Sequence, residues 1–227
     1  MPRNTLDPIH SALRGPSVTS SSTPRAFDVR HLQLARAAFA ALAAIMVTFS
    51  PDHSAVLGLG VFSGFALATG LVFALSAWLV FPRGERMIPV LLASVSILAG
   101  LVSSVGAWRT TGVFFGVVIA WALVSGLIEL LGALRDRKAG RAAGVRDGVL
   151  IGILSIVLAA VLLLTPAQYA LHYDITGAGS FTLTGITIAV GLFGGYAAVV
   201  AVFLAIAGFS PRRPEPVAAV SPEEAAS

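Results

Sequence analysis

Glu129 is the only acidic residue inside a segment long and apolar enough to cross a membrane. A carboxylate in such a place is costly to bury, and it commonly marks a proton-linked site or a ligand contact. Glu129 also lies six residues before Arg135, which is about 9 Å along a helix at 1.5 Å per residue. The alternative is therefore an ion pair near the membrane interface, with a side chain such as Arg83 or Arg86.

A second set of titratable residues lies in the segments that connect the predicted membrane spans on the outer side of the membrane. It comprises Asp52, His53, Arg109, His172 and Asp174. Histidine changes its charge near pH 6.5, so two histidines beside two aspartates favour a pH-responsive surface. The same residue types can form a metal site, but short loops also contain polar residues without any such role. We expect no bound metal.

The composition defines the class of protein that presents these residues. Of the 227 residues, 56% are hydrophobic and 11% are charged, whereas soluble domains contain about 25% charged residues. This excludes a soluble enzyme and a nucleic-acid-binding protein, and it identifies the lipid bilayer as a partner. Cysteine is absent, so no disulfide or thiol nucleophile exists. No Ser/His/Asp set or phosphate-binding loop stands out, so we expect neither an enzyme nor a cofactor.

Long runs without Asp, Glu, Lys or Arg predict an all-α membrane protein with six transmembrane helices. Arg36 lies in the first predicted helix and is expected to extend its charge towards the interface. A transmembrane domain over residues 34–210 is predicted between disordered tails at 1–33 and 211–227, which are rich in Ser, Thr, Pro and Ala. The predicted helices cover residues 34–50, 57–81, 88–107, 112–134, 148–164 and 183–209.

The distribution of basic residues predicts the orientation of these helices. Fourteen of the 15 Lys and Arg residues lie in the two tails, the first helix, or the segments between helices two and three and between helices four and five. The exception is Arg109. Positive residues remain in the cytoplasm, so both termini are predicted to be cytoplasmic.

The six helices also form an internal repeat of three hairpins. The second helix of each hairpin contains a related glycine pattern: Thr69-Gly70, Ser125-Gly126 and Gly194-Gly195. All three hairpins start on the same side, so the repeat is parallel. This arrangement differs from the inverted repeats of many transporters.

Glycines spaced four residues apart occur in several predicted spans. Such spacing places them on one helix face and permits close approach of two helices. We expect packing within the six-helix bundle, with homo-oligomerisation as the alternative. The pairs are Gly60 and Gly64, Gly112 and Gly116, Gly148 and Gly152, and Gly191 and Gly195.

Two apolar segments resemble the HdeD-like acid-resistance membrane proteins. Residues 118–135 (VIAWALVSGLIELLGALR) resemble the fourth helix of that family, and residues 146–166 (RDGVLIGILSIVLAAVLLLTP) resemble the fifth. The resemblance implies a bacterial inner-membrane protein associated with acid or envelope stress. The family carries no established catalytic residues, so none is transferred. The long N-terminal tail and the enlarged segment 167–182 depart from the family pattern.

The sequence is compatible with three functions. The first is a non-enzymatic role in stress tolerance, as the resemblance implies. The second is a small transporter or channel, which requires a polar cavity joining both sides or ending at Glu129. The third is a membrane scaffold acting through its tails, which a dry interior packed by glycines would favour. Segment 167–182 is either an ordered cap over the bundle or a flexible connector.

Overall fold

The computed structural model describes residues 29–141, 144–177 and 179–210, and it contains the six expected membrane-spanning helices. The helices are α1 (Val29–Phe49), α2 (Ala55–Leu79), α3 (Met87–Ser104), α4 (Thr111–Lys138), α5 (Val145–Leu164) and α6 (Gly185–Phe209). Each is long and apolar enough to cross a bilayer. The prediction of an all-α polytopic membrane protein is confirmed.

Two helix boundaries differ clearly from those predicted. Helix α1 begins at Val29, so residues 29–33 are helical rather than part of a tail, and α4 continues beyond Leu134 to Lys138. The predicted spans end at charged residues. A helix can nevertheless continue beyond the hydrocarbon core of the bilayer, because its backbone hydrogen bonds are internal. Basic residues in the last turn of α4 also favour the negative end of the helix dipole. The remaining parts of the predicted tails, 1–28 and 211–227, lie outside the described residues.

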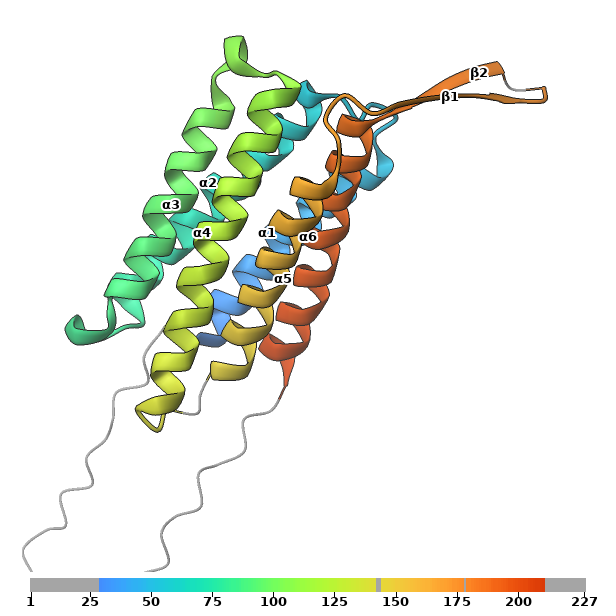
Figure 1. Ribbon diagram of the computed structural model, residues 1–227. Helices are drawn as coiled ribbons and strands as arrows, with labels where there is room; N and C mark the ends of the chain where they lie inside the picture. The colour runs from blue at the N-terminus through green and yellow to red at the C-terminus, as the bar shows by residue number, and fades with distance from the viewer. Residues whose placement is uncertain (1–28, 142–143, 178, 211–227) are drawn as a thin grey trace, which may run out of the picture.

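The helices surround a common interior, and the closest pairs are α2 with α3, α4 with α5, and α1 with α6 (Figure 1). These pairs join helices from different predicted hairpins. Gly70 explains the close approach of α2 to α3, and Gly126 explains that of α4 to α5. A Cβ at Gly70 would lie 2.7 Å from Cγ1 of Ile97, and one at Gly126 would lie 2.9 Å from the carbonyl oxygen of Gly152. A third close approach joins Gly194 to Val47.

The predicted Gly-x-x-x-Gly faces separate into two groups. Gly148 and Gly152 pack against α4, as expected for bundle packing. A Cβ at five other glycines would meet nothing within 4 Å, and one at Gly60 would meet only the Arg109 guanidinium. The prediction that these faces pack within the bundle is therefore wrong, because they point away from the neighbouring helices. The five glycines are Gly64, Gly112, Gly116, Gly191 and Gly195.

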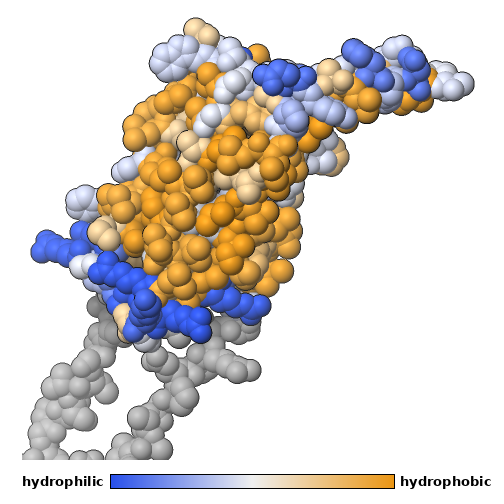
Figure 2. Space-filling model, in the orientation of Figure 1, coloured by the Kyte–Doolittle hydropathy of each residue, from blue (hydrophilic) through white to orange (hydrophobic). Residues whose placement is uncertain are grey.

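Both described chain ends lie at the same end of the bundle (Figure 1). We call it the basic end because the basic residues of α4 and of the short helix η1 (Arg83–Glu85) lie there, and it forms a hydrophilic band in Figure 2. A broad apolar belt separates it from the opposite end. There, η2 (Gly106–Trp108) joins α3 to α4, and two antiparallel strands, β1 (Ala170–Ile175) and β2 (Gly179–Thr184), form a hairpin. We call this the hairpin end.

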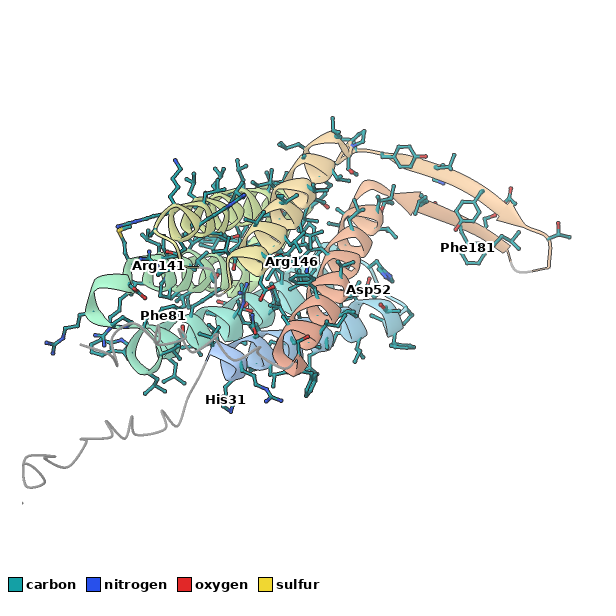
Figure 3. All side chains as sticks on the ribbon, turned by 90° about the horizontal axis from the view of Figure 1, so that it is seen from below. His31, Asp52, Phe81, Arg141, Arg146 and Phe181 are labelled. Atoms are coloured by element: carbon teal, nitrogen blue, oxygen red, sulfur yellow. The ribbon has the colours of Figure 1, made fainter. Side chains whose placement is uncertain are left out.

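The hairpin resolves the two alternatives for segment 167–182. Its described residues form the two paired strands, and these project sideways from the bundle instead of covering it (Figures 1 and 3). Helix α6 consequently begins at Gly185, because residues 183 and 184 belong to β2.

Candidate functional site

The centre of the candidate site is an ion pair between Arg36 on α1 and Glu129 on α4. Nη2 of Arg36 lies 2.6 Å from Oε1 of Glu129, and the two side chains are 14% and 8% exposed. The guanidinium also lies 4.3 Å from the ring centre of Phe73. Arg36 therefore turns inward to a buried carboxylate, and the expectation that it extends to the interface is wrong.

The pairing of Glu129 was one of the two alternatives from the sequence, but its partner differs from those suggested. Arg83 and Arg86 follow the end of α2, whereas Arg36 approaches from α1, 93 positions away in the chain. Reasoning from separation along one helix could not find a partner that tertiary packing supplies. The sequence signal for this partner was Arg36 itself, a charge within an otherwise apolar segment.

Two further polar pairs lie nearer the basic end. Nε2 of Gln33 donates to a carboxylate oxygen of Asp147 at 2.6 Å, which joins α1 to α5. Nη2 of Arg141 donates to Asp136 at 2.5 Å. This hydrogen bond raises the pKa of the Arg141 guanidinium above its ordinary value.

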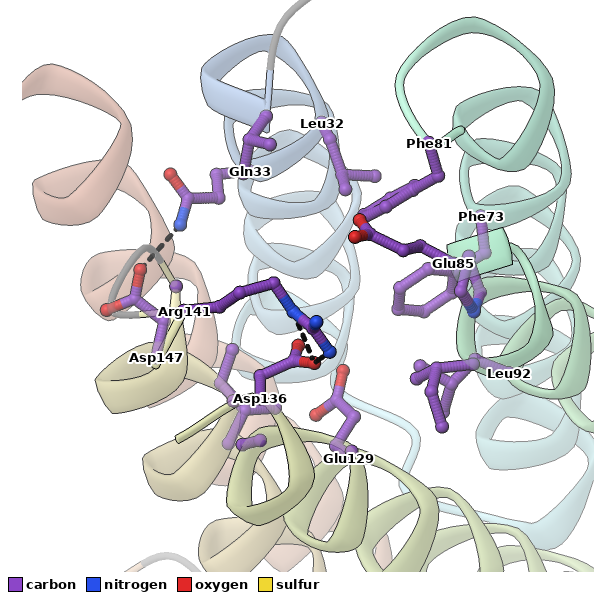
Figure 4. Close-up of a pocket in the computed structure, with 18 of the residues that line it drawn as sticks. Leu32, Gln33, Phe73, Phe81, Glu85, Leu92, Glu129, Asp136, Arg141 and Asp147 are labelled. Carbon is purple, nitrogen blue, oxygen red and sulfur yellow. Dashed lines mark hydrogen bonds and ion pairs between the residues drawn. The ribbon is translucent and has the colours of Figure 1, made fainter. Parts of the chain in front are cut away.

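These pairs surround a cavity of about 460 Å³ that reaches from the loops of the basic end to the ion pair (Figure 4). Apolar side chains form one wall, which includes Leu32, Phe73, Phe81 and Leu92. Charged side chains surround the remainder, among them Glu85, Asp136, Arg141 and Asp147. Such a combination of apolar wall and few polar groups is typical of small-molecule sites. The interior is thus not filled by side chains at this end.

A smaller chamber of about 20 Å³ lies beyond the ion pair, towards the hairpin end. Every helix contributes a polar side chain to its lining: Arg36, Thr69, Ser96, Ser125, Glu129, Ser155 and Tyr196. Trp121 donates to Ser96 at 3.2 Å, and Ser155 and Tyr196 share a hydrogen bond of 2.8 Å. The buried hydroxyl of Thr69 has no protein partner among the described residues. The chamber has room for one water that could bind it.

Four aromatic side chains close the interior on the hairpin side of this chamber. Phe62 packs edge-on against Trp121 and Phe193, with ring centres 5.3 and 5.5 Å apart. Phe65 makes the same type of contact with both rings. Helix α2 runs from the hairpin end to the basic end, so Phe62 and Phe65 precede Thr69 along the axis. We call Phe62, Phe65, Trp121 and Phe193 the aromatic plug.

The second predicted set is dispersed over the hairpin end. Asp52 accepts hydrogen bonds from Ser54 in the turn before α2, and His53 lies in the same turn. Arg109 lies between η2 and α4, while His172 and Asp174 project from β1. The hydrogen bonds of Asp52, His172 and Asp174 remain within their own turn or hairpin. Among the described residues, no group of three or more His, Asp or Glu side chains could hold a metal ion.

Comparisons with protein-family models, with curated proteins and with solved structures find no match to this chain. The resemblance of residues 118–135 and 146–166 to HdeD-like proteins therefore stays a prediction.

Proposed function

We propose that this protein is a non-enzymatic membrane transporter for a small zwitterionic solute, which enters from the basic end and binds at Arg36 and Glu129. The observation that carries the proposal is a cavity of about 460 Å³ that ends at a buried ion pair inside the membrane-spanning region. A cavity ending at Glu129 is the feature that distinguishes a transporter from a scaffold with a dry interior. Intramembrane charges commonly mark substrate or ion pathways.

The charges at the end of the cavity favour a zwitterion. Arg36 and Glu129 are joined by a single hydrogen bond, although a guanidinium has five N–H donors and a carboxylate can accept several. A solute with both an anionic and a cationic group can replace this bond by two ion pairs, and neither buried charge loses its partner. A solute with one charge would leave one of them unpaired, which is costly in an apolar site.

The aromatic plug closes the interior towards the hairpin end. In the described chain, the site is therefore accessible only from the basic end. Transport then requires that the interior open towards the hairpin end while it closes at the basic end. The close pairs α2–α3, α4–α5 and α1–α6 provide three bodies whose relative displacement would move the plug residues, because Phe62, Trp121 and Phe193 lie on different pairs. Rigid-body movement around a fixed site is a common transport mechanism.

Charge distribution and resemblance support the cellular setting of this proposal. The concentration of Lys and Arg at the basic end supports a cytoplasmic position for both termini. The resemblance to HdeD-like proteins supports the bacterial cytoplasmic membrane and a role in tolerance of acid or envelope stress. The cavity then takes its solute from the cytoplasm.

The proposal is tested with purified protein in proteoliposomes. Counterflow of radiolabelled small zwitterions, namely amino acids and betaines, is measured for the wild type, Glu129→Gln and Asp136→Asn. Glu129→Gln is expected to abolish uptake, because it leaves Arg36 without its charge partner. Asp136→Asn makes the same chemical change near the mouth of the cavity and is expected to retain most uptake. Equal uptake by wild type and Glu129→Gln would contradict the proposal, as would no uptake of any zwitterion by the wild type.

The scaffold alternative is separated by removing residues 1–28 and 212–227. A transporter is expected to retain uptake without these tails, whereas a scaffold would lose its cellular effect. Survival at acid pH of a strain without the protein, complemented with wild type or Glu129→Gln, tests the stress role. Full rescue by Glu129→Gln would show that the stress role does not depend on the cavity.

A further inference from the structure

The β1–β2 hairpin has one apolar face and one polar face. In the antiparallel register, Leu171 pairs with Leu183, and Tyr173 pairs with Phe181. Directly paired residues share a face, and alternate residues along a strand lie on the same side. Ile175 therefore joins these four on one surface, where the Tyr173 and Phe181 rings stack with centres 5.9 Å apart. We call these five residues the apolar hairpin face.

The opposite face contains the polar side chains of the hairpin. Nδ1 of His172 lies 2.7 Å from the hydroxyl of Thr182, and Ser180 donates to the carboxylate of Asp174. These cross-strand pairs fix the same register as the apolar pairs do. The hairpin is thus amphipathic, with a clear separation of residue types between its two surfaces.

Four of the five residues of the apolar hairpin face are not covered by the described chain, and the fifth, Leu183 at the base of the hairpin, is partly buried. Leu171, Tyr173, Ile175 and Phe181 are between 42% and 48% exposed. Figure 3 places Phe181 well outside the helix bundle. An isolated two-stranded hairpin is at best marginally stable in water, so a second surface against this face would stabilise it.

The direction of the hairpin identifies that surface. It projects sideways from the hairpin end, across the direction of the helices (Figures 1 and 3). In Figure 2 the hydrophobic atoms of the hairpin lie mainly along its lower side, towards the level of the apolar belt, and the hydrophilic atoms lie mainly along its upper side. The connection at its base is tight. The N–H of Gly185 donates to the carbonyl of Tyr169 at 2.8 Å, and a Cβ at Gly185 would collide with the carbonyl oxygen of Pro166.

We infer that the apolar hairpin face lies on the lipid bilayer and anchors the α5–α6 connection to the membrane surface. The apolar belt of the helices extends to just below the base of the hairpin, so one bilayer can contact both. Amphipathic elements commonly lie in the interface with their apolar side among the acyl chains, and Tyr is enriched there. Both strands have an unpaired edge, which cannot be buried in hydrocarbon. The backbone therefore remains at headgroup depth, with His172 and Asp174 directed to water.

The absence of cysteine makes this placement directly testable in the full chain. Phe181→Cys and Thr182→Cys are adjacent residues on opposite faces, and each is labelled with a nitroxide in liposomes. Power saturation then compares collisions with oxygen, which concentrates in lipid, and with a water-soluble nickel chelate. Leu171→Cys and His172→Cys form a second matched pair on the other strand, nearer the bundle, in case loss of the Phe181 ring separates the strands.

We expect labels at 181 and 171 to collide more with oxygen than with nickel, and labels at 182 and 172 to show the reverse. Equal access to the nickel chelate on both faces would overturn the inference. Protection of 181 and 171 from both reagents, together with spin–spin broadening between labels, would also overturn it, because the occupant would then be a second copy of the chain. Circular dichroism and size-exclusion chromatography check that each variant retains the fold. The result does not depend on transport.

Discussion

The ion pair between Arg36 and Glu129 makes a quantitative prediction about stability. Two unit charges about 4 Å apart attract by about 4 kcal/mol at an effective dielectric constant of about 20. Removing one partner of a buried pair typically costs about 3–5 kcal/mol, because the remaining charge stays buried without compensation. With side chains 14% and 8% exposed, Arg36→Met and Glu129→Leu should each lower the free energy of unfolding by about 3–5 kcal/mol.

The double substitution should reverse most of this loss. Met and Leu fill similar volumes without leaving a charge, and such replacements of buried pairs are often neutral or stabilising. We therefore expect the double variant to be about as stable as the wild type. The assay is reversible unfolding in mixed micelles with increasing denaturing detergent, followed by helical circular dichroism. A loss below about 1 kcal/mol for either single variant, or two losses that simply add, would refute the view that these charges depend on one another in a buried site.

Two further predictions concern packing and the small chamber. Gly126→Ala places a methyl group 2.9 Å from the Gly152 carbonyl oxygen, so it should destabilise the bundle by about 1–3 kcal/mol. Gly64→Ala makes the same change where nothing lies within 4 Å, and equal unfolding of both variants in the micelle assay would contradict the assigned α4–α5 contact. Thr69→Val removes a buried hydroxyl that we expect to bind a water in the small chamber. It should lower the free energy of unfolding by about 1 kcal/mol, whereas Thr69→Ser keeps the hydroxyl and should be as stable as the wild type. Increased stability of Thr69→Val would show that the hydroxyl is truly unsatisfied.

The helical architecture could be predicted because it depends on local composition. A run of about 20 apolar residues must form its hydrogen bonds internally in a bilayer, and a helix does so from its own backbone. The sequence therefore determined the six spans, and the positions of Lys and Arg along the chain indicated that the described basic residues other than Arg109 lie towards one end. Glu129 was recognisable for the same reason, since a charge in an apolar run is visible in the sequence alone.

The glycine patterns were only partly informative. Gly126 and Gly64 both lie in apolar helices, yet one contacts a neighbouring helix and the other faces outward. Spacing along a helix identifies which residues share a face, but it does not identify what that face meets. The tertiary structure decides this because the rotation of each helix depends on all its neighbours.

The hairpin was missed as secondary structure for a different reason. Segment 170–184 alternates apolar and polar residues, from Leu171, His172 and Tyr173 onwards, and such alternation is a strand signal. Each strand has only six residues, so the alternation is much shorter than the apolar runs that indicate membrane-spanning helices.

The sequence by itself determined that this is a membrane protein, where its spans lie and which residues are exceptional within them. Only the tertiary structure decided that Arg36 is the partner of Glu129, that a cavity ends at their contact and that an aromatic plug closes the interior. The physical reason is the separation along the chain over which each interaction acts. Partition into lipid acts on each segment separately, whereas an ion pair between α1 and α4, 93 positions apart, exists only once the helices have packed.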